Sequence, residues 1–126
     1  MKTGGCLCGA VRYELSQDPK DFRACHCTMC RKVSGYYWAA FHVPAGALRL
    51  TETRGLSWFR SSASAERGFC KDCGSALFYR PTGSQDYEVA PGSVDGEVGA
   101  KLIGHIFVAD KGDYYDIADG LPQRND

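Results

Sequence analysis

Seven cysteines carry most of the chemistry that this 126-residue sequence could support, and they fall into three short clusters. The clusters are Cys6 with Cys8, then Cys25 with Cys27 and Cys30, and finally Cys70 with Cys73. Thiols one or two residues apart suit a single Zn²⁺ ion, because a short loop can turn neighbouring sulfurs onto one tetrahedral site. Four thiolates close a structural site, whereas three leave a position free for substrate. Two zinc ions per chain are therefore predicted, one of each kind.

Other uses of the cysteines fit the sequence less well. No apolar segment follows the first five residues, so we do not expect a secretion signal. We expect a cytoplasmic location, in which the thiols are reduced. The ferredoxin spacings are absent, and seven thiolates would leave one iron–sulfur cluster incomplete. Disulfide or redox chemistry at the thiols stays as the alternative to zinc.

The charge balance argues against two classes of partner. The 15 Lys and Arg residues are matched by 15 Asp and Glu residues, which gives no excess for binding nucleic acid or an anionic membrane. No run of about 18 apolar residues is available to span a bilayer. We therefore expect a single domain over residues 1–126, with small-molecule partners and with neither nucleic acid nor membrane.

Most of the chain has the pattern of short β-strands. Residues 10–16 alternate, with Val11, Tyr13 and Leu15 on one face and charged residues between them. Other short segments combine aromatic and β-branched residues and are bounded by Gly, Pro, Ser or Asp. These predicted strands are residues 36–43, 47–54, 56–61, 75–80, 87–90 and 102–109.

Only residues 28–34 favour a helix. Thr28 is a plausible N-cap, and Gly35 stands where a glycine would end the helix. Cys27 and Cys30 would then enter the first turn, where free N–H groups and the helix dipole favour a thiolate over a thiol. A zinc ion held by the middle cluster is expected to be accessible.

The two outer clusters have the form of matching half-sites. Each ends in Cys-Gly followed by a predicted strand, and a glycine there lets the backbone turn so that N–H groups point at sulfur. Together, Cys6, Cys8, Cys70 and Cys73 would make one closed four-thiolate site. The spacing also allows other partitions, including one that combines Cys25 and Cys27 with an outer pair.

The three histidines are weaker candidates. His26 alternates with two cysteines on an extended segment, so we expect it to support a ligand or face solvent rather than bind metal. His42 and His105 lie in apolar strands, where a histidine is more often a core or pocket-wall residue than a catalytic one.

Five stretches of the sequence resemble the glutathione-dependent formaldehyde-activating enzyme family, which is related to centromere protein V. Residues 5–9 read GCLCG and lead into Val11-Arg12-Tyr13, residues 25–35 contain CHCxxCRK and SG, and residues 67–75 read RGFCxxCGS. Residues 92–95 (GSVD) and 115–122 (YDIADGLP) are similar to the family's later motifs. Tyr114 and Tyr115 stand where many relatives have a tryptophan-containing tail.

The resemblance implies a mainly β fold, the β-tent, in which stacked antiparallel sheets are bridged by zinc and accompanied by one short helix. It also implies which cysteines bind which ion. The structural ligands would be Cys6, Cys8, Cys70 and Cys73, and the catalytic ligands would be Cys25, Cys27 and Cys30. The family's named reaction joins glutathione to formaldehyde, a carbon–sulfur bond formation that is classed with the lyases.

The predicted function is therefore that of a zinc-dependent carbon–sulfur lyase acting on a glutathione-like thiol and a small aldehyde, as in S-(hydroxymethyl)glutathione formation. The thiol would occupy the free position at the middle cluster and attack an aldehyde held beside it. Residues 36–38 and 105–107 are candidate pocket walls, although aromatic residues of this kind more often fill the core. Asp116 and Asp119 are candidates for capping turns or for bracing the tail. The alternatives are a non-catalytic, zinc-stabilised binding module and a zinc-buffering or thiol-redox protein.

Overall fold

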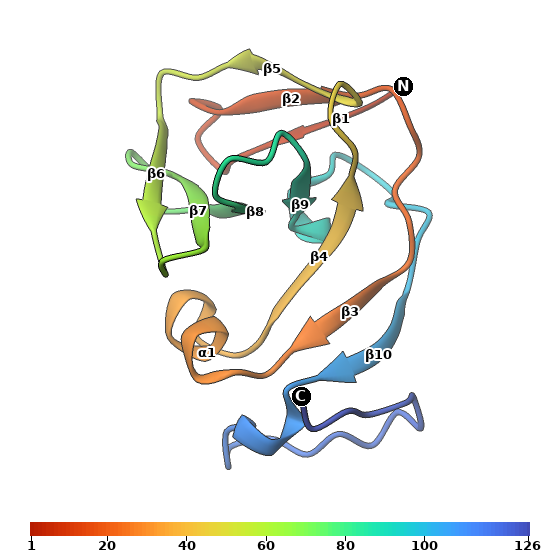
Figure 1. The fold of residues 1–126 in the computed structure, drawn as a ribbon. Coiled ribbons are helices and arrows are strands. Elements are labelled where there is room, and N and C mark those ends of the chain that lie inside the picture. Colours follow the sequence, from red (N-terminus) through yellow and green to blue (C-terminus); the bar gives the residue numbers. More distant parts are fainter.

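The computed structural model describes residues 1–126 and contains ten β-strands, one α-helix and two short 3₁₀ turns (Figure 1). The prediction of a mainly β fold with one short helix is confirmed. In chain order the elements are β1 (Lys2–Gly5), β2 (Arg12–Leu15), β3 (Phe22–Cys25), α1 (Thr28–Ser34), β4 (Trp38–Val43), β5 (Leu48–Glu52), β6 (Leu56–Arg60), β7 (Ala65–Cys70), β8 (Ala76–Pro81), β9 (Tyr87–Val89), η1 (Pro91–Ser93), β10 (Leu102–Ile106) and η2 (Val108–Asp110).

The predicted strands all form, although most are one to three residues shorter than the pattern indicated. The last one ends early, at Ile106, because Phe107 adopts a left-handed conformation with φ of 55° and η2 follows it. Three strands, β1, β3 and β7, were not predicted. Two of them contain glycine, and β3 is only four residues long, so none has a clear alternating pattern.

The strands form two sheets. The smaller has the order β1-β2-β5, and the larger has the order β10-β3-β4-β9-β8-β7-β6. Strands β3 and β10 run from the body of the molecule towards the end that holds α1, and β4 runs back from α1 into the body (Figure 1). The expectation of antiparallel sheets holds for every pairing except one: β10 pairs with β3 in parallel, with Ile106 opposite Cys25. A parallel pair requires a long crossover, and here β4 to β9 lie between the two strands in sequence.

The main core lies between the two sheets. The inward residues of β2, Tyr13 and Leu15, are 1% exposed, as the alternation predicted, and they pack in one cluster with residues of β4, β8 and β9. The Tyr13 ring meets the edge of Phe78 with ring centroids 5.7 Å apart. Its hydroxyl is satisfied by a hydrogen bond with Ser93 Oγ at 2.6 Å, which ties η1 to the core.

Helix α1 has the predicted bounds, but its N-cap is Cys27 rather than Thr28. The Cys27 sulfur accepts a hydrogen bond from the backbone N–H of Cys30, which is the role a serine or aspartate oxygen usually has. Gly35 ends the helix as predicted, with φ of 85°, and its N–H donates to the carbonyl of Arg31. A thiol that is placed to bind a metal therefore also starts the helix.

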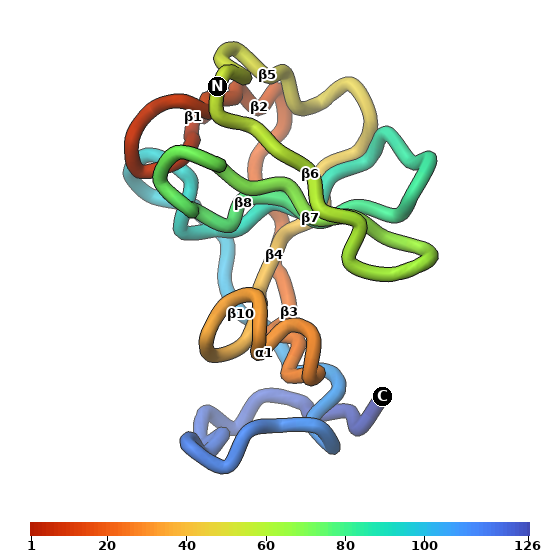
Figure 2. Tube along the Cα trace, turned by 90° about the vertical axis from the view of Figure 1, so that its left-hand side faces the viewer, coloured from red at the N-terminus to blue at the C-terminus, as the bar shows by residue number.

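The segment after β10 folds back along that strand. The His105 N–H donates to the Pro122 carbonyl, and the Arg124 N–H donates to the His105 carbonyl. Figure 2 shows this tail, in blue, at the end of the molecule farthest from β1, β2 and β5, with α1 next to it. None of the helices has both the length and the apolar character needed to cross a membrane.

Candidate metal centres

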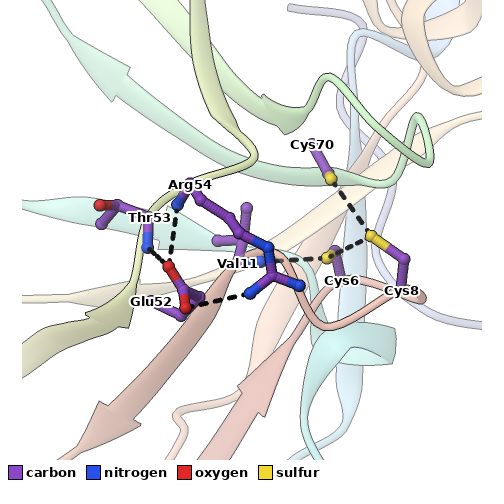
Figure 3. Close-up of polar contacts among 7 residues, drawn as sticks. All are labelled: Cys6, Cys8, Val11, Glu52, Thr53, Arg54 and Cys70. Carbon is purple, nitrogen blue, oxygen red and sulfur yellow. Dashed lines mark hydrogen bonds and ion pairs between the residues drawn. The ribbon is translucent and has the colours of Figure 1, made fainter.

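The sulfurs of Cys6, Cys8, Cys70 and Cys73 all lie within 4.8 Å of one another. Cys8 Sγ is 3.7 Å from Cys6 Sγ and 3.7 Å from Cys70 Sγ, and none of the cysteines is in a disulfide. Figure 3 shows the sulfurs of Cys6, Cys8 and Cys70 pointing towards one another. Four thiols gathered this closely form a donor set that suits one tetrahedral zinc ion.

Backbone turns present these sulfurs in both half-sites. Gly9 and Gly74 follow a cysteine and have φ of 86° and 81°, a conformation that other residues rarely adopt. The Val11 N–H donates to Cys6 Sγ at 3.2 Å, so the turn also supplies a donor to a sulfur (Figure 3). The glycines that follow Cys8 and Cys73 therefore adopt the turn conformation that the sequence predicted for them.

Ser75 links the two half-sites. Its hydroxyl oxygen lies 3.2 Å from Cys73 Sγ and accepts a hydrogen bond from the Leu7 N–H at 3.1 Å. The hydrogen bond from the Ser75 hydroxyl is the main cause that lowers the pKa of the Cys73 thiol to about 5. A thiol that is deprotonated at neutral pH is ready to act as a metal ligand.

The second cluster consists of Cys25, Cys27 and Cys30, whose sulfurs also lie within 4.8 Å of one another. Cys25 ends β3, Cys27 caps α1 and Cys30 lies in its first turn. Cys30 is buried, whereas Cys25 and Cys27 are partly exposed. The alternative partition, in which two of these cysteines join an outer pair, is not what the structure shows.

Arg67, on strand β7, reaches this second cluster. Its Nη2 donates to Cys30 Sγ at 3.4 Å, and the side chain is 8% exposed. The guanidinium lies 5.0 Å from the ring centroid of Tyr79, a cation–π contact that helps to hold it. The hydrogen bond from the Cys25 thiol, together with Arg67, lowers the pKa of Cys30 to about 5. Arg67 was not predicted as a site residue, although this arginine begins the RGFCxxCGS motif.

A cavity of about 490 Å³ opens beside the three-cysteine cluster. The residues that line it come from β3, α1, β4 and β7 to β10, and they include all three cysteines together with Trp38, Arg67, Tyr79, Glu88, Ile106 and Phe107. The two predicted wall segments therefore contribute in part, since Trp38, Ile106 and Phe107 face this space. Tyr36, Tyr37 and His105 line a different cavity, on the side of His26.

His26 points away from the cysteines that flank it and is completely buried, so solvent exposure is not its role. Its Nδ1 pairs with the Tyr115 hydroxyl, and its Nε2 lies 2.9 Å from His105 Nδ1. His105 Nε2 is 2.8 Å from a carboxylate oxygen of Asp119. We name Tyr115, His26, His105 and Asp119 the back-side network.

One hydrogen arrangement satisfies the whole back-side network with both imidazoles neutral. Tyr115 O–H donates to His26, the other His26 nitrogen donates to His105, and His105 donates to Asp119. Burial, and then the neighbouring His105, lower the pKa of His26, which agrees with a neutral ring. Asp119 also accepts from the Leu121 N–H, as a turn cap does, whereas Asp116 makes no such contact. The network thus holds His26, which lies between Cys25 and Cys27 in the segment that joins β3 to α1.

His42 lies on the exposed end of β4. Its Nε2 is 3.0 Å from an Asp86 carboxylate oxygen, and the side chain lines the edge of the cavity. It is therefore a pocket-wall residue, which is one of the two roles that the sequence predicted for it; the other was a core residue.

The two clusters are expected to differ in how firmly they hold metal. Protein prepared with zinc should contain about two ions per chain, and mild chelator should remove the ion at Cys25, Cys27 and Cys30 first, because that site faces a cavity and has only three thiols. Metal analysis before and after chelation measures this. A single ion that is wholly kept or wholly lost would contradict the division into four and three.

Known proteins resemble this chain in sequence and in fold. The sequence profile of the glutathione-dependent formaldehyde-activating enzyme family matches residues 1–110. An uncharacterised lyase of Schizosaccharomyces pombe is 29% identical over 91% of this chain and 84% of its own length. A Halomonas elongata protein, provisionally named a glutathione-dependent formaldehyde-activating enzyme, is 34% identical over 60% of this chain.

The match covers only 53% of the Halomonas protein's length. A crystal structure of a Rhodobacter sphaeroides protein shares the fold, with a TM-score of 0.63 and 23% identity over 79% of this chain and 99% of the other. From the length of the profile match, the chain belongs to the glutathione-dependent formaldehyde-activating enzyme family.

Proposed function

We propose that this protein is a zinc-dependent carbon–sulfur lyase that joins a glutathione-like thiol to a small aldehyde, as in the formation of S-(hydroxymethyl)glutathione. The observation that carries the proposal is the three-thiol cluster at the wall of a 490 Å³ cavity. Family membership supports a function of the glutathione-related, formaldehyde-activating type.

The donor sets fit zinc at both clusters. Soft thiolates are preferred zinc ligands, and the sulfur separations in each cluster allow one ion to be shared. We propose Cys6, Cys8, Cys70 and Cys73 as ligands of a structural ion that bridges the start of the chain to the β7–β8 turn. We propose Cys25, Cys27 and Cys30 as ligands of a catalytic ion. Zinc at the second site would act as a Lewis acid and would favour the thiolate form of a substrate thiol.

The protein's own residues would prepare that site in three ways. Arg67 places a positive charge against Cys30, the back-side network holds the segment between Cys25 and Cys27 through His26, and Trp38 and Phe107 line the cavity around the reactants. In the reaction, the thiol sulfur forms a bond to the carbonyl carbon, and the carbonyl oxygen takes up a proton in place of the one lost by the thiol. The atoms balance without an oxidant or a reductant.

Cobalt substitution tests whether a thiol enters the second site. Adding glutathione to the cobalt-loaded protein is expected to change the visible spectrum, because a further sulfur adds charge-transfer absorption and alters the coordination. The Cys30→Ser variant should lose this response. The four-thiol site provides an internal reference, because its absorption should not change. An equal response in the variant, or none in the wild type, would remove the support for catalysis and favour the binding module.

A further inference from the structure

One face of the larger sheet forms part of the cavity wall, and four polar residues on it follow a single row across neighbouring strands. His42 on β4 pairs with Glu88 on β9, Glu88 pairs with Tyr79 on β8, and Tyr79 pairs with Arg67 on β7. Directly paired residues point to the same face of a sheet. All four side chains line the cavity beside the cysteines, so this row is part of its surface.

Glu88 is the unusual member of the row. It is partly buried, yet its carboxylate has no hydrogen bond or ion pair within the chain, although the other members are engaged. Arg67 contacts Cys30 and Tyr79, and His42 is paired with Asp86. Burial raises the pKa of the Glu88 carboxyl above its ordinary range, with His42 opposing the shift and Asp86 adding to it. A carboxylate that has lost part of its hydration without gaining a donor is stabilised by an arriving cation.

The row also sets a distance. Neighbouring strands are about 4.8 Å apart, so Glu88 stands about 10 Å along the sheet from Arg67, two strands away. Arg67 marks the end of the cavity where the cysteine sulfurs lie. Glu88 makes no hydrogen bond to a cysteine, and it lies two strands from the residue that contacts Cys30, within reach of the remote end of a peptide-sized thiol.

We propose that Glu88 is a specificity-determining residue that binds the protonated amino group of the substrate, so that the site selects amino-acid-type thiols over neutral thiols. The proposal rests on the proposed function, since it assumes that the thiol sulfur lies at the three-cysteine cluster. It adds a second contact point, which fixes the orientation of the substrate along the sheet.

Binding of three thiols to the zinc-loaded full-length protein tests the proposal by calorimetry. The probes are glutathione, its analogue without the α-amino group (glutaryl-cysteinylglycine) and 2-mercaptoethanol. Wild-type protein is expected to bind glutathione about tenfold more tightly than the des-amino analogue, the loss typical of one charge-assisted contact. The Glu88→Gln variant should bind both peptides equally and should keep its affinity for mercaptoethanol. Glu14→Gln, a carboxylate change in the other sheet, should behave as wild type.

Each other outcome has a definite meaning. Equal binding of the two peptides by wild-type protein, or a preference that survives in Glu88→Gln, overturns the role of Glu88 while leaving the proposed function in place. Failure of wild-type protein to bind any of the three thiols overturns the proposed function and this inference with it. If Glu88→Gln does not fold, Glu88→Asp is the second variant: it keeps the charge and is expected to retain part of the preference, and an undiminished or absent preference in it counts against the contact.

Discussion

Replacing Cys70 by serine is expected to abolish cooperative folding, whereas replacing Cys27 is expected to leave the fold largely intact. Cys70 is completely buried in the core cluster, and it belongs to the only group of four thiols that joins the start of the chain to the β7–β8 turn. Zinc binding in small domains supplies folding free energy on the order of 10 kcal/mol, which is comparable with the whole stability of a domain, about 5–15 kcal/mol. Cys27 lies at the cavity, outside the core cluster.

Soluble yield and thermal melting followed by circular dichroism measure the difference. Cys8→Ser is a useful companion to Cys70→Ser, because Cys8 is exposed and its loss creates no cavity in the core. Collapse in both variants would therefore report on metal binding rather than on packing. Similar destabilisation by Cys27→Ser and by Cys70→Ser would contradict the assignment of a structural role to the four-thiol cluster and a catalytic role to the three-thiol cluster.

The second prediction concerns catalysis, where the loss of one thiol is expected to remove the whole acceleration. In an equilibrium mixture of glutathione and formaldehyde, wild-type protein should accelerate exchange between glutathione and its adduct, and Cys27→Ser should reduce this exchange to the uncatalysed rate. Without Cys27, the site keeps two thiols, and the hydrogen bond that the Cys30 N–H donates to sulfur is lost. A serine can still cap the helix, so the variant changes the ligand more than the local fold.

Exchange NMR measures the rate at equilibrium, where the spontaneous net reaction does not interfere. Lys32→Ala is the matched control, because Lys32 is exposed on the same helix and does not line the cavity. Equal exchange in wild type and Cys27→Ser would contradict the lyase proposal. The acceleration over the spontaneous reaction is expected to be modest, since supplying thiolate is the main contribution that the site can make.

Patterns within a few residues of sequence predicted those parts of the fold that interactions between near neighbours in the chain determine. Tyr13 and Leu15 are buried because they alternate along β2, with Val11 continuing the pattern just before the strand. Helix α1 ends at Gly35 because glycine accepts a left-handed conformation. Strand β7 shows the limit of this approach. A Cβ at Gly68 would lie 2.9 Å from the Phe78 ring and 3.0 Å from Trp58, so this glycine is set by packing across three strands. The sequence of β7 has little strand propensity by itself.

The candidate site divides in the same way. The spacing of the cysteines in each short cluster could be read directly, because their sulfurs are neighbours along the chain. Arg67 and Glu88 could not, since each reaches the cavity only through the register of β7, β8 and β9. The back-side network likewise depends on a fold in which His26 meets Tyr115, 89 residues later. Candidate metal ligands can therefore be predicted from the sequence more easily than the residues that surround the metal.

The four-thiol cluster takes its cysteines from two segments that are distant in sequence, and this imposes an order in time on the newly made chain. Cys8 and Cys70 are 62 residues apart, and at about 5–20 residues per second a ribosome takes about 3–12 s to cover that interval. During this time Cys6 and Cys8 form only half of a ligand set. Cys25, Cys27 and Cys30 are therefore the first complete set of thiols that the growing chain presents, so the site proposed for chemistry is available to metal before the site proposed to hold the fold together.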